Sequence, residues 1–365
     1  MLLRPRFLII AMLLGLDSLC AHDLSPRLPA RLAIYYGYPS QVNGARGDVE
    51  KAASVFSAYD VVVLGDGVEF ADLQPGRRPE GVGAQEHNHA AQIIRILKDR
   101  HPATRVFGYV CLGDSQALSN RELKQRILLW SQMKVAGIFL DEAGYDWKIV
   151  TRLRQNTAVG YIHQLGLSAF LNAYRPEDLF SLENISEKNP GRISSRLGAR
   201  DLFLLESFQI KSGSYEFASE WQQRLLPALA YRQKYGSHIF ATTTAPGTAP
   251  FSLKQFDYAW WSAWLYDLDG FGWGEPNFAA SSAALPDHRC TLNRAVLEGL
   301  RGAGQVASDG VRFRRAGRGL VAVVDTRDHS VRFASPSQGV ESMAAASRLA
   351  PRPPAPLPAC ETSNE

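Results

Sequence analysis

Two acidic residues stand out because each directly follows a run of apolar residues. Asp141 ends the run AGIFLD, and Glu206 ends the run DLFLLE. A carboxyl group at the end of a buried strand costs desolvation free energy unless it is hydrogen-bonded or takes part in chemistry. Glycoside hydrolysis needs a pair of carboxyl groups, one as acid and one as nucleophile or base. We therefore take Asp141 and Glu206 as a candidate catalytic pair, although the sequence leaves open their separation, the stereochemical outcome and which of them is the acid.

Polar and aromatic residues also follow the other apolar runs. Aromatic rings present flat faces to sugar rings, so carboxylates among aromatic side chains indicate a carbohydrate site. Any one of these rings has wall packing as its alternative role. The residues expected to position a sugar are Tyr36, Asp66, Tyr109, Glu142, Tyr145, Asp146, Asn172, Gln209, Trp273 and Glu275. The same strand ends carry Tyr38, Glu69, Asp114, Tyr174, Thr242 and Thr243, and the few cations there are chiefly Lys148, Arg175 and Lys211.

These residues need a scaffold that brings many strand ends to one place. The chain repeats a short β-branched and aromatic run, a loop and an amphipathic stretch, and near-continuous apolar strands that alternate with helices predict a parallel sheet buried on both faces. Eight such units predict closure into an α/β (β/α)8 TIM barrel, whose chemistry lies at the carboxyl ends of the strands. A doubly wound open sheet is the alternative, but no GxGxxG opens a helix. The runs span 32–37, 60–65, 105–113, 136–142, 167–174, 201–208, 238–244 and 269–275.

The segments between these runs carry helix signals. Ser119 with Glu122 forms a capping box, in which each side chain satisfies a backbone donor of the first helical turn. Helical spacing of apolar residues is found over 48–59, 86–100, 148–164, 215–235 and 252–266. A helix over 291–300 is expected to complete the ring. Short strands at 311–314, 319–325 and 330–333 predict a small β appendage on the barrel.

The two ends of the chain have different compositions from the middle. Residues 1–21 carry two Arg near their start, continue with a short apolar run and end at Ala21, as in a secretory signal peptide. We therefore expect a secreted or periplasmic protein, with no stable membrane insertion once the signal is removed and no lipid anchor at Cys20, because Leu19 is not the small residue of a lipobox. Residues 335–365 are rich in Pro, Ala and Ser and predict a flexible tail. The barrel is expected over 31–302 and the appendage over 303–334.

Composition and motifs argue against several other functions. The 365 residues carry 40 Lys and Arg against 36 Asp and Glu, without the clustered basic stripes of a nucleic-acid-binding protein. The sequence contains no GxSxG motif, which is the motif expected of a serine hydrolase. The motif EHNH at 86–89 has residue types that bind metals, but the sequence shows no well-placed third ligand. Helix capping or substrate contact is therefore favoured over a metal site. Cys290 and Cys360 form a disulfide in one interpretation and remain thiols, like Cys111, in the other.

Several strand-end motifs together resemble one known family. IYYGYPS, YDVVVLG, VFGYVCLG, GIFLDEAGYDW, the LNAY strand end and LLESFQI are similar to the endo-α-1,4-polygalactosaminidases (glycoside hydrolase family 114) and their spherulin-4-like relatives, over about residues 31–280. The most specific parts are FLDxxGYD and the Glu of the sixth strand. The first strand departs from the Trp-rich start of many polygalactosaminidases, which affects the substrate more than the fold.

The resemblance implies a secreted (β/α)8 hydrolase that acts on a galactosamine-containing polysaccharide without a metal or organic cofactor. Asp141 matches the catalytic Asp of the family's fourth strand, and Glu206 matches the acidic residue of its sixth strand. An acidic mouth also suits a cationic amino sugar polymer by charge complementarity. The rival interpretation is a barrel that binds polysaccharide without cleaving it.

Overall fold

The structure is a computed structural model that describes residues 28–65, 67–71, 84–245, 251–274, 278 and 294–336. The predicted signal peptide, most of the predicted tail, Cys290, Cys360 and the candidate residues Asp66 and Glu275 lie outside these ranges. Within them, no helix is both long enough and apolar enough to cross a membrane.

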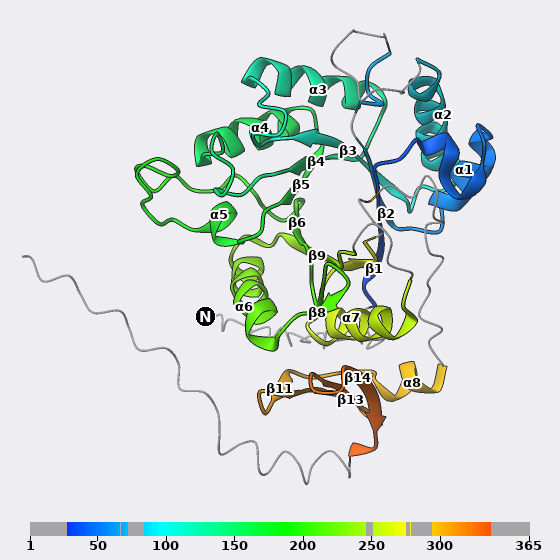
Figure 1. The fold of residues 1–365 in the computed structure, drawn as a ribbon, viewed down its shortest axis with the longest axis vertical. Helices are drawn as coiled ribbons and strands as arrows, with labels where there is room; N and C mark the ends of the chain where they lie inside the picture. The colour runs from blue at the N-terminus through cyan, green and yellow to red at the C-terminus, as the bar shows by residue number, and fades with distance from the viewer. Residues whose placement is uncertain are drawn as a thin grey trace, which may run out of the picture.

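Eight parallel strands close into a barrel, and each of the eight predicted runs contributes one of them. Going round the barrel, the order is β1, β2, β3, β4, β5, β6, β9 and β10, with β10 paired to β1. The chain is therefore a (β/α)8 barrel with a small antiparallel sheet at its C-terminal end (Figure 1). The barrel strands are β1 (Ala30–Tyr35), β2 (Val61–Leu64), β3 (Arg105–Cys111), β4 (Gly137–Asp141), β5 (Ser168–Asn172), β6 (Leu202–Leu205), β9 (His238–Thr242) and β10 (Gly270–Gly272).

Helices cover the outside of the barrel close to the predicted positions. The capping box of Ser119 and Glu122 is confirmed at the start of α3. The predicted helix over 148–164 begins only at Arg152, because the side chain of Thr151 caps it. The predicted helix over 215–235 begins at Ala218, because Tyr215 pairs with Ile210 in a short hairpin. The elements are η1 (Pro39–Gly44), α1 (Val49–Phe56), α2 (Ala84–Arg100), α3 (Asn120–Gln132), α4 (Arg152–Gln164), α5 (Glu177–Phe180), β7 (Ile210–Lys211), β8 (Ser214–Tyr215), α6 (Ala218–Tyr235) and α7 (Leu253–Leu265).

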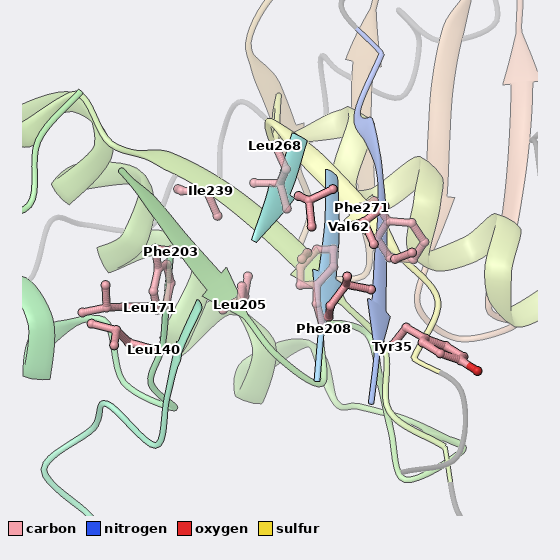
Figure 2. Close-up of a cluster of buried hydrophobic side chains, with 14 of the residues drawn as sticks. Tyr35, Val62, Leu140, Leu171, Phe203, Leu205, Phe208, Ile239, Leu268 and Phe271 are labelled. Atoms are coloured by element: carbon pink, nitrogen blue, oxygen red, sulfur yellow. The ribbon is translucent and has the colours of Figure 1, made fainter. Parts of the chain in front are cut away.

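Alternation along the strands divides the core into two layers, because successive strand residues point to opposite faces. One cluster fills the barrel interior and includes Phe107, Phe139 and Phe170, whose rings meet edge to face. The other lies between strands and helices, where Leu140, Leu171 and further side chains gather (Figure 2). The parity of the interior cluster carries forward to the strand ends, so that residues two positions beyond Phe139 and Phe170 also face inward.

The predicted β appendage is confirmed as a four-stranded antiparallel sheet that contacts α7. Side-chain contacts join the barrel and the appendage. The ring of Trp261 lies 4.7 Å from that of Phe333, and Arg315 forms an ion pair with Asp267. The strands are β11 (Val306–Ser308), β12 (Arg312–Ala316), β13 (Val321–Asp325) and β14 (Ser330–Ala334).

The helix after the eighth strand, α8 (Arg294–Gly299), differs from the expectation. The carbonyl of Gly299 accepts hydrogen bonds from the backbone N–H groups of Gly319 and Leu320, in the turn between β12 and β13. Figure 1 shows α8 beside the small sheet. This helix therefore joins the appendage instead of completing the ring.

Candidate active site

A pocket of about 490 Å³ opens at the carboxyl ends of the barrel strands. Both candidate catalytic carboxylates line it, and none of the described lining residues is a Lys or Arg. The predicted acidic and aromatic mouth is therefore present in the described part of the chain. The lining residues are Tyr36, Asp141, Glu142, Asp146, Trp147, Asn172, Ala173, Tyr174, Glu206 and Phe278.

Asn172 joins the two carboxylates. Its Nδ2 atom donates to Oδ1 of Asp141 at 2.9 Å and to Oε2 of Glu206 at 2.8 Å. A side-chain amide carries two N–H groups, so each carboxylate receives one of them. The two accepting oxygens are at most 5.7 Å apart, which is the sum of these two distances. Strand order explains the arrangement, because β5 lies between β4 and β6.

The main chain turns sharply after each of the two carboxylates. Glu142, next to Asp141, has φ 54°, and Ser207, next to Glu206, has φ 56°. Neither is a glycine, and such left-handed residues cost free energy that proteins keep mainly at functional sites. Each turn follows directly on the carboxylate at the end of a strand, and both carboxylates line the pocket.

Burial and hydrogen bonding compete at Asp141. Desolvation is the largest cause that raises its pKa, to about 6, and the charge of Glu206 raises it further. Hydrogen bonds from Asn172, from the backbone N–H of Glu142 and from Tyr109 act in the opposite direction, because they stabilise the anion. Every one of these partners is a donor. These hydrogen bonds offset part of the cost of burial, and the pKa of Asp141 remains raised, at about 6.

Glu142 lines the pocket but its carboxylate is used in the neighbouring loop. Its Oε2 atom accepts from the backbone N–H of Ser115 at 3.1 Å and from the thiol of Cys111 at 3.3 Å. Cys111 is a free and buried cysteine, and burial raises the pKa of its thiol to about 11. Glu142 therefore ties the loop after β3 to the end of β4.

Arg224 on α6 bonds to the main chain directly after β6. Its guanidinium donates to the backbone carbonyls of Glu206 and Ser207, and it forms an ion pair with both carboxylate oxygens of Glu216. The side chains of Arg224 and Glu216 are 5% and 1% exposed. The same guanidinium lies 4.9 Å from the ring centre of Tyr174. Nothing in the strand-end pattern pointed to Arg224, because it comes from the middle of a helix.

Aromatic side chains form the wall on the β1 side. The ring of Tyr36 lies 5.2 Å from that of Tyr109 and 5.5 Å from that of Phe278. Tyr36 and Phe278 line the pocket, whereas Tyr109 lies beneath Tyr36, 8% exposed, and reaches Asp141. Phe278 and Trp147 were not among the predicted site residues.

Besides Tyr109, three predicted sugar contacts lie away from the pocket lining. Tyr145 packs beside Arg152, and its backbone N–H donates to Asp178. Gln209 is 1% exposed, and Trp273 packs against Phe251 in the outer core. Trp273 has the same outward parity as Phe271 two residues before it, and it therefore lies in the layer between the strands and the helices.

Most of the weaker strand-end candidates have structural contacts. Glu69 forms a buried ion pair with Arg126. Asp114 accepts from the backbone N–H groups of Lys148 and Ile149, and so shapes the loop that carries Trp147. The hydroxyl of Thr243 accepts from the backbone N–H of Gly274.

The EHNH motif also makes structural contacts. Glu86 accepts from Ser40 and contacts His89, while His87 contacts the carbonyl of Val68. No group of three or more His, Cys, Asp and Glu in the described ranges has the arrangement of a metal site.

Comparisons with known proteins add little to this geometry. No protein-family model matches the chain, and a search of curated proteins finds no match. An endo-β-1,4-glucanase from Xanthomonas axonopodis pv. citri is 11% identical, with a TM-score of 0.42 over 68% of this chain and 88% of the other. XacCel5A in complex with cellopentaose is 11% identical, with a TM-score of 0.41 over 68% and 90%. PhdJ bound to a substrate intermediate is 9% identical, with a TM-score of 0.36 over 69% and 68%. Similarities this low carry no conclusion about activity.

Proposed function

We propose that this protein is a glycoside hydrolase that cleaves a polysaccharide with Asp141 and Glu206. The observation that supports this most is the single amide of Asn172 bonded to both carboxylates inside an acidic, aromatic-lined pocket. One carboxyl group would protonate the leaving oxygen while the other stabilises or attacks the anomeric carbon.

The short separation favours retention of configuration. Carboxyl groups lie about 5–5.5 Å apart in retaining glycosidases and about 6.5–9.5 Å apart in inverting ones, where a water molecule must fit between nucleophile and sugar. Two oxygens at most 5.7 Å apart fit the retaining case.

The hydrogen bonds favour one assignment of the two roles. Asp141 accepts from three donors, whereas Glu206 accepts from Asn172, so we take Asp141 as the nucleophile, which works as an anion. In the first step Asp141 bonds to the anomeric carbon while the glycosidic C–O bond breaks and Glu206 gives its proton to the leaving oxygen. In the second step Glu206 takes a proton from water, the water oxygen bonds to the anomeric carbon, and the bond to Asp141 breaks.

The charge of the pocket favours a cationic substrate. Asp141, Glu142, Asp146 and Glu206 line it, and opposite charge attracts a partly deacetylated amino sugar. The strand-end resemblance to the polygalactosaminidases points to galactosamine. With the predicted signal peptide, these features describe a secreted or periplasmic enzyme acting on extracellular or envelope polysaccharide.

The test is the release of new reducing ends from α-1,4-linked galactosamine polymer. We expect release by the wild-type protein and loss of at least 99% of it in Asp141→Asn and in Glu206→Gln. Glu177→Gln is a matched control, because Glu177 lies on α5 and does not line the pocket. Full activity in either carboxylate variant would overturn the pair. Binding of the polymer without any product would favour a non-catalytic polysaccharide-binding protein.

A further inference from the structure

Tyr174 is a large aromatic side chain left open at the edge of the pocket. It lines the pocket two residues after Asn172, yet it is 47% exposed. Tyrosine is enriched at binding surfaces, because it combines an apolar ring with a polar hydroxyl.

Two cationic side chains contact the ring of Tyr174. Arg224, only 4% exposed, lies 4.9 Å from the ring centre. The Nζ atom of Lys211 lies 3.4 Å from the hydroxyl and 5.2 Å from the ring centre, and so sits at the hydroxyl edge. With both contacts in place, 47% of the residue is still exposed. A ring that is already fixed loses less conformational entropy when a ligand stacks on it.

The strand order places Tyr174 across the barrel from the other aromatic wall. Tyr36 follows β1 and Tyr174 follows β5, and these two strands are diametrically opposite in the closed order. The carboxylates of Asp141 and Glu206 come from the strands on either side of β5. Aromatic residues that follow opposite strands therefore line the same pocket.

We propose that Tyr174 is the stacking platform of a second sugar subsite, so that the pocket binds a chain of sugar units across the barrel rather than a single terminal unit. Tyr36 and Phe278 then contact the chain on the opposite side, and Arg224 and Lys211 keep the platform in place. This inference rests on the proposed function for the identity of the ligand as a polysaccharide.

The test compares oligomers with single units. Binding of α-1,4-linked galactosamine pentamer, chitosan pentamer and galactosamine monomer is measured by calorimetry on proteins that carry Glu206→Gln. We expect Tyr174→Ala to weaken binding of at least one pentamer roughly tenfold, as loss of an aromatic stacking contact of about 1.4 kcal/mol would do. Binding of the monomer should change less than twofold.

Two further variants separate stacking from general damage. Tyr174→Phe keeps the ring and its contact with Arg224 but loses the hydroxyl contact with Lys211, and should weaken pentamer binding much less than Tyr174→Ala does. Tyr161 on α4 is another partly buried tyrosine in contact with a cation, Lys124 of α3, and it does not line the pocket. Tyr161→Ala should therefore leave binding unchanged. Melting temperatures confirm that each variant is folded.

Two results would overturn the platform: equal pentamer binding by the parent and Tyr174→Ala, or no pentamer binding by the parent. The proposed hydrolysis fails separately, if the wild-type protein releases no reducing ends while binding still depends on Tyr174.

Discussion

The side-chain amide of Asn172 lies 2.9 Å from Oδ1 of Asp141, and its second N–H reaches Glu206. This one residue sets the spacing of the two carboxylates and lowers the pKa of Asp141 relative to burial alone.

Replacing Asn172 by Ala should therefore affect chemistry more than binding. We expect kcat to fall about 10- to 100-fold, as when one stabilising hydrogen bond is removed from a catalytic site, with a smaller change in KM. The loss of a donor to the Asp141 anion should also move the acidic limb of the pH profile to higher pH. Steady-state kinetics between pH 4 and pH 9 check both effects. An unchanged kcat would show that Asn172 only fills space.

The activity of the wild-type protein should depend on the ionisation of Asp141. The pKa of this residue is raised to about 6, and a nucleophile works as the anion. We predict that kcat/KM on a small aryl glycoside rises between pH 5 and pH 7, with half of the rise near pH 6. Activity that is highest below pH 5 and falls through pH 6 would mean that Asp141 acts in its protonated form.

The ionised carboxylate of Asp141 should lower the free energy of unfolding at neutral pH. Its pKa is higher in the folded protein than in the unfolded chain, so its contribution to stability is greatest below the unfolded value of 3.8 and is lost as pH rises through about 6. Asp141→Asn should therefore raise the free energy of unfolding at pH 7, by roughly 1–3 kcal/mol. Urea unfolding at pH 7 and pH 4 checks this. A gain that is equal at both pH values would contradict the electrostatic cause.

The sequence predicts the barrel and the position of Asp141 and Glu206 at one end of it, because both depend on period-two alternation along buried strands. Asp141 follows Phe139 and Asn172 follows Phe170 at the inward parity, and Glu206 follows Leu204 in the same way. The same parity places Trp273 outward with Phe271, which strand-end position alone did not reveal.

Residues in loops and helices follow no such rule. Trp147 reaches the pocket from the loop after β4, whose path depends on backbone hydrogen bonds to Asp114. Arg224 acts from α6 through two main-chain carbonyls, a contact that has no signature in its own segment. Strand periodicity identifies neither residue.

Arg224 should be far more important for stability than an exposed arginine with a similar ion pair. Arg224→Met leaves Glu216 buried without its cation, and we expect a loss of about 3–5 kcal/mol. Arg100 also contacts both oxygens of a glutamate, Glu50, but the two side chains are 60% and 56% exposed. Arg100→Met should cost less than about 1 kcal/mol. Urea unfolding measures both, and equal losses would contradict this role of burial.

The configuration of the first product tests the proposed two-carboxylate reaction most directly. Proton NMR during hydrolysis of α-1,4-linked galactosamine oligomers distinguishes the α anomer from the β anomer before mutarotation mixes them. Because Asp141 and Glu206 share one donor and their accepting oxygens are at most 5.7 Å apart, we predict that the α anomer forms first. Initial formation of the β anomer would contradict a covalent intermediate on Asp141.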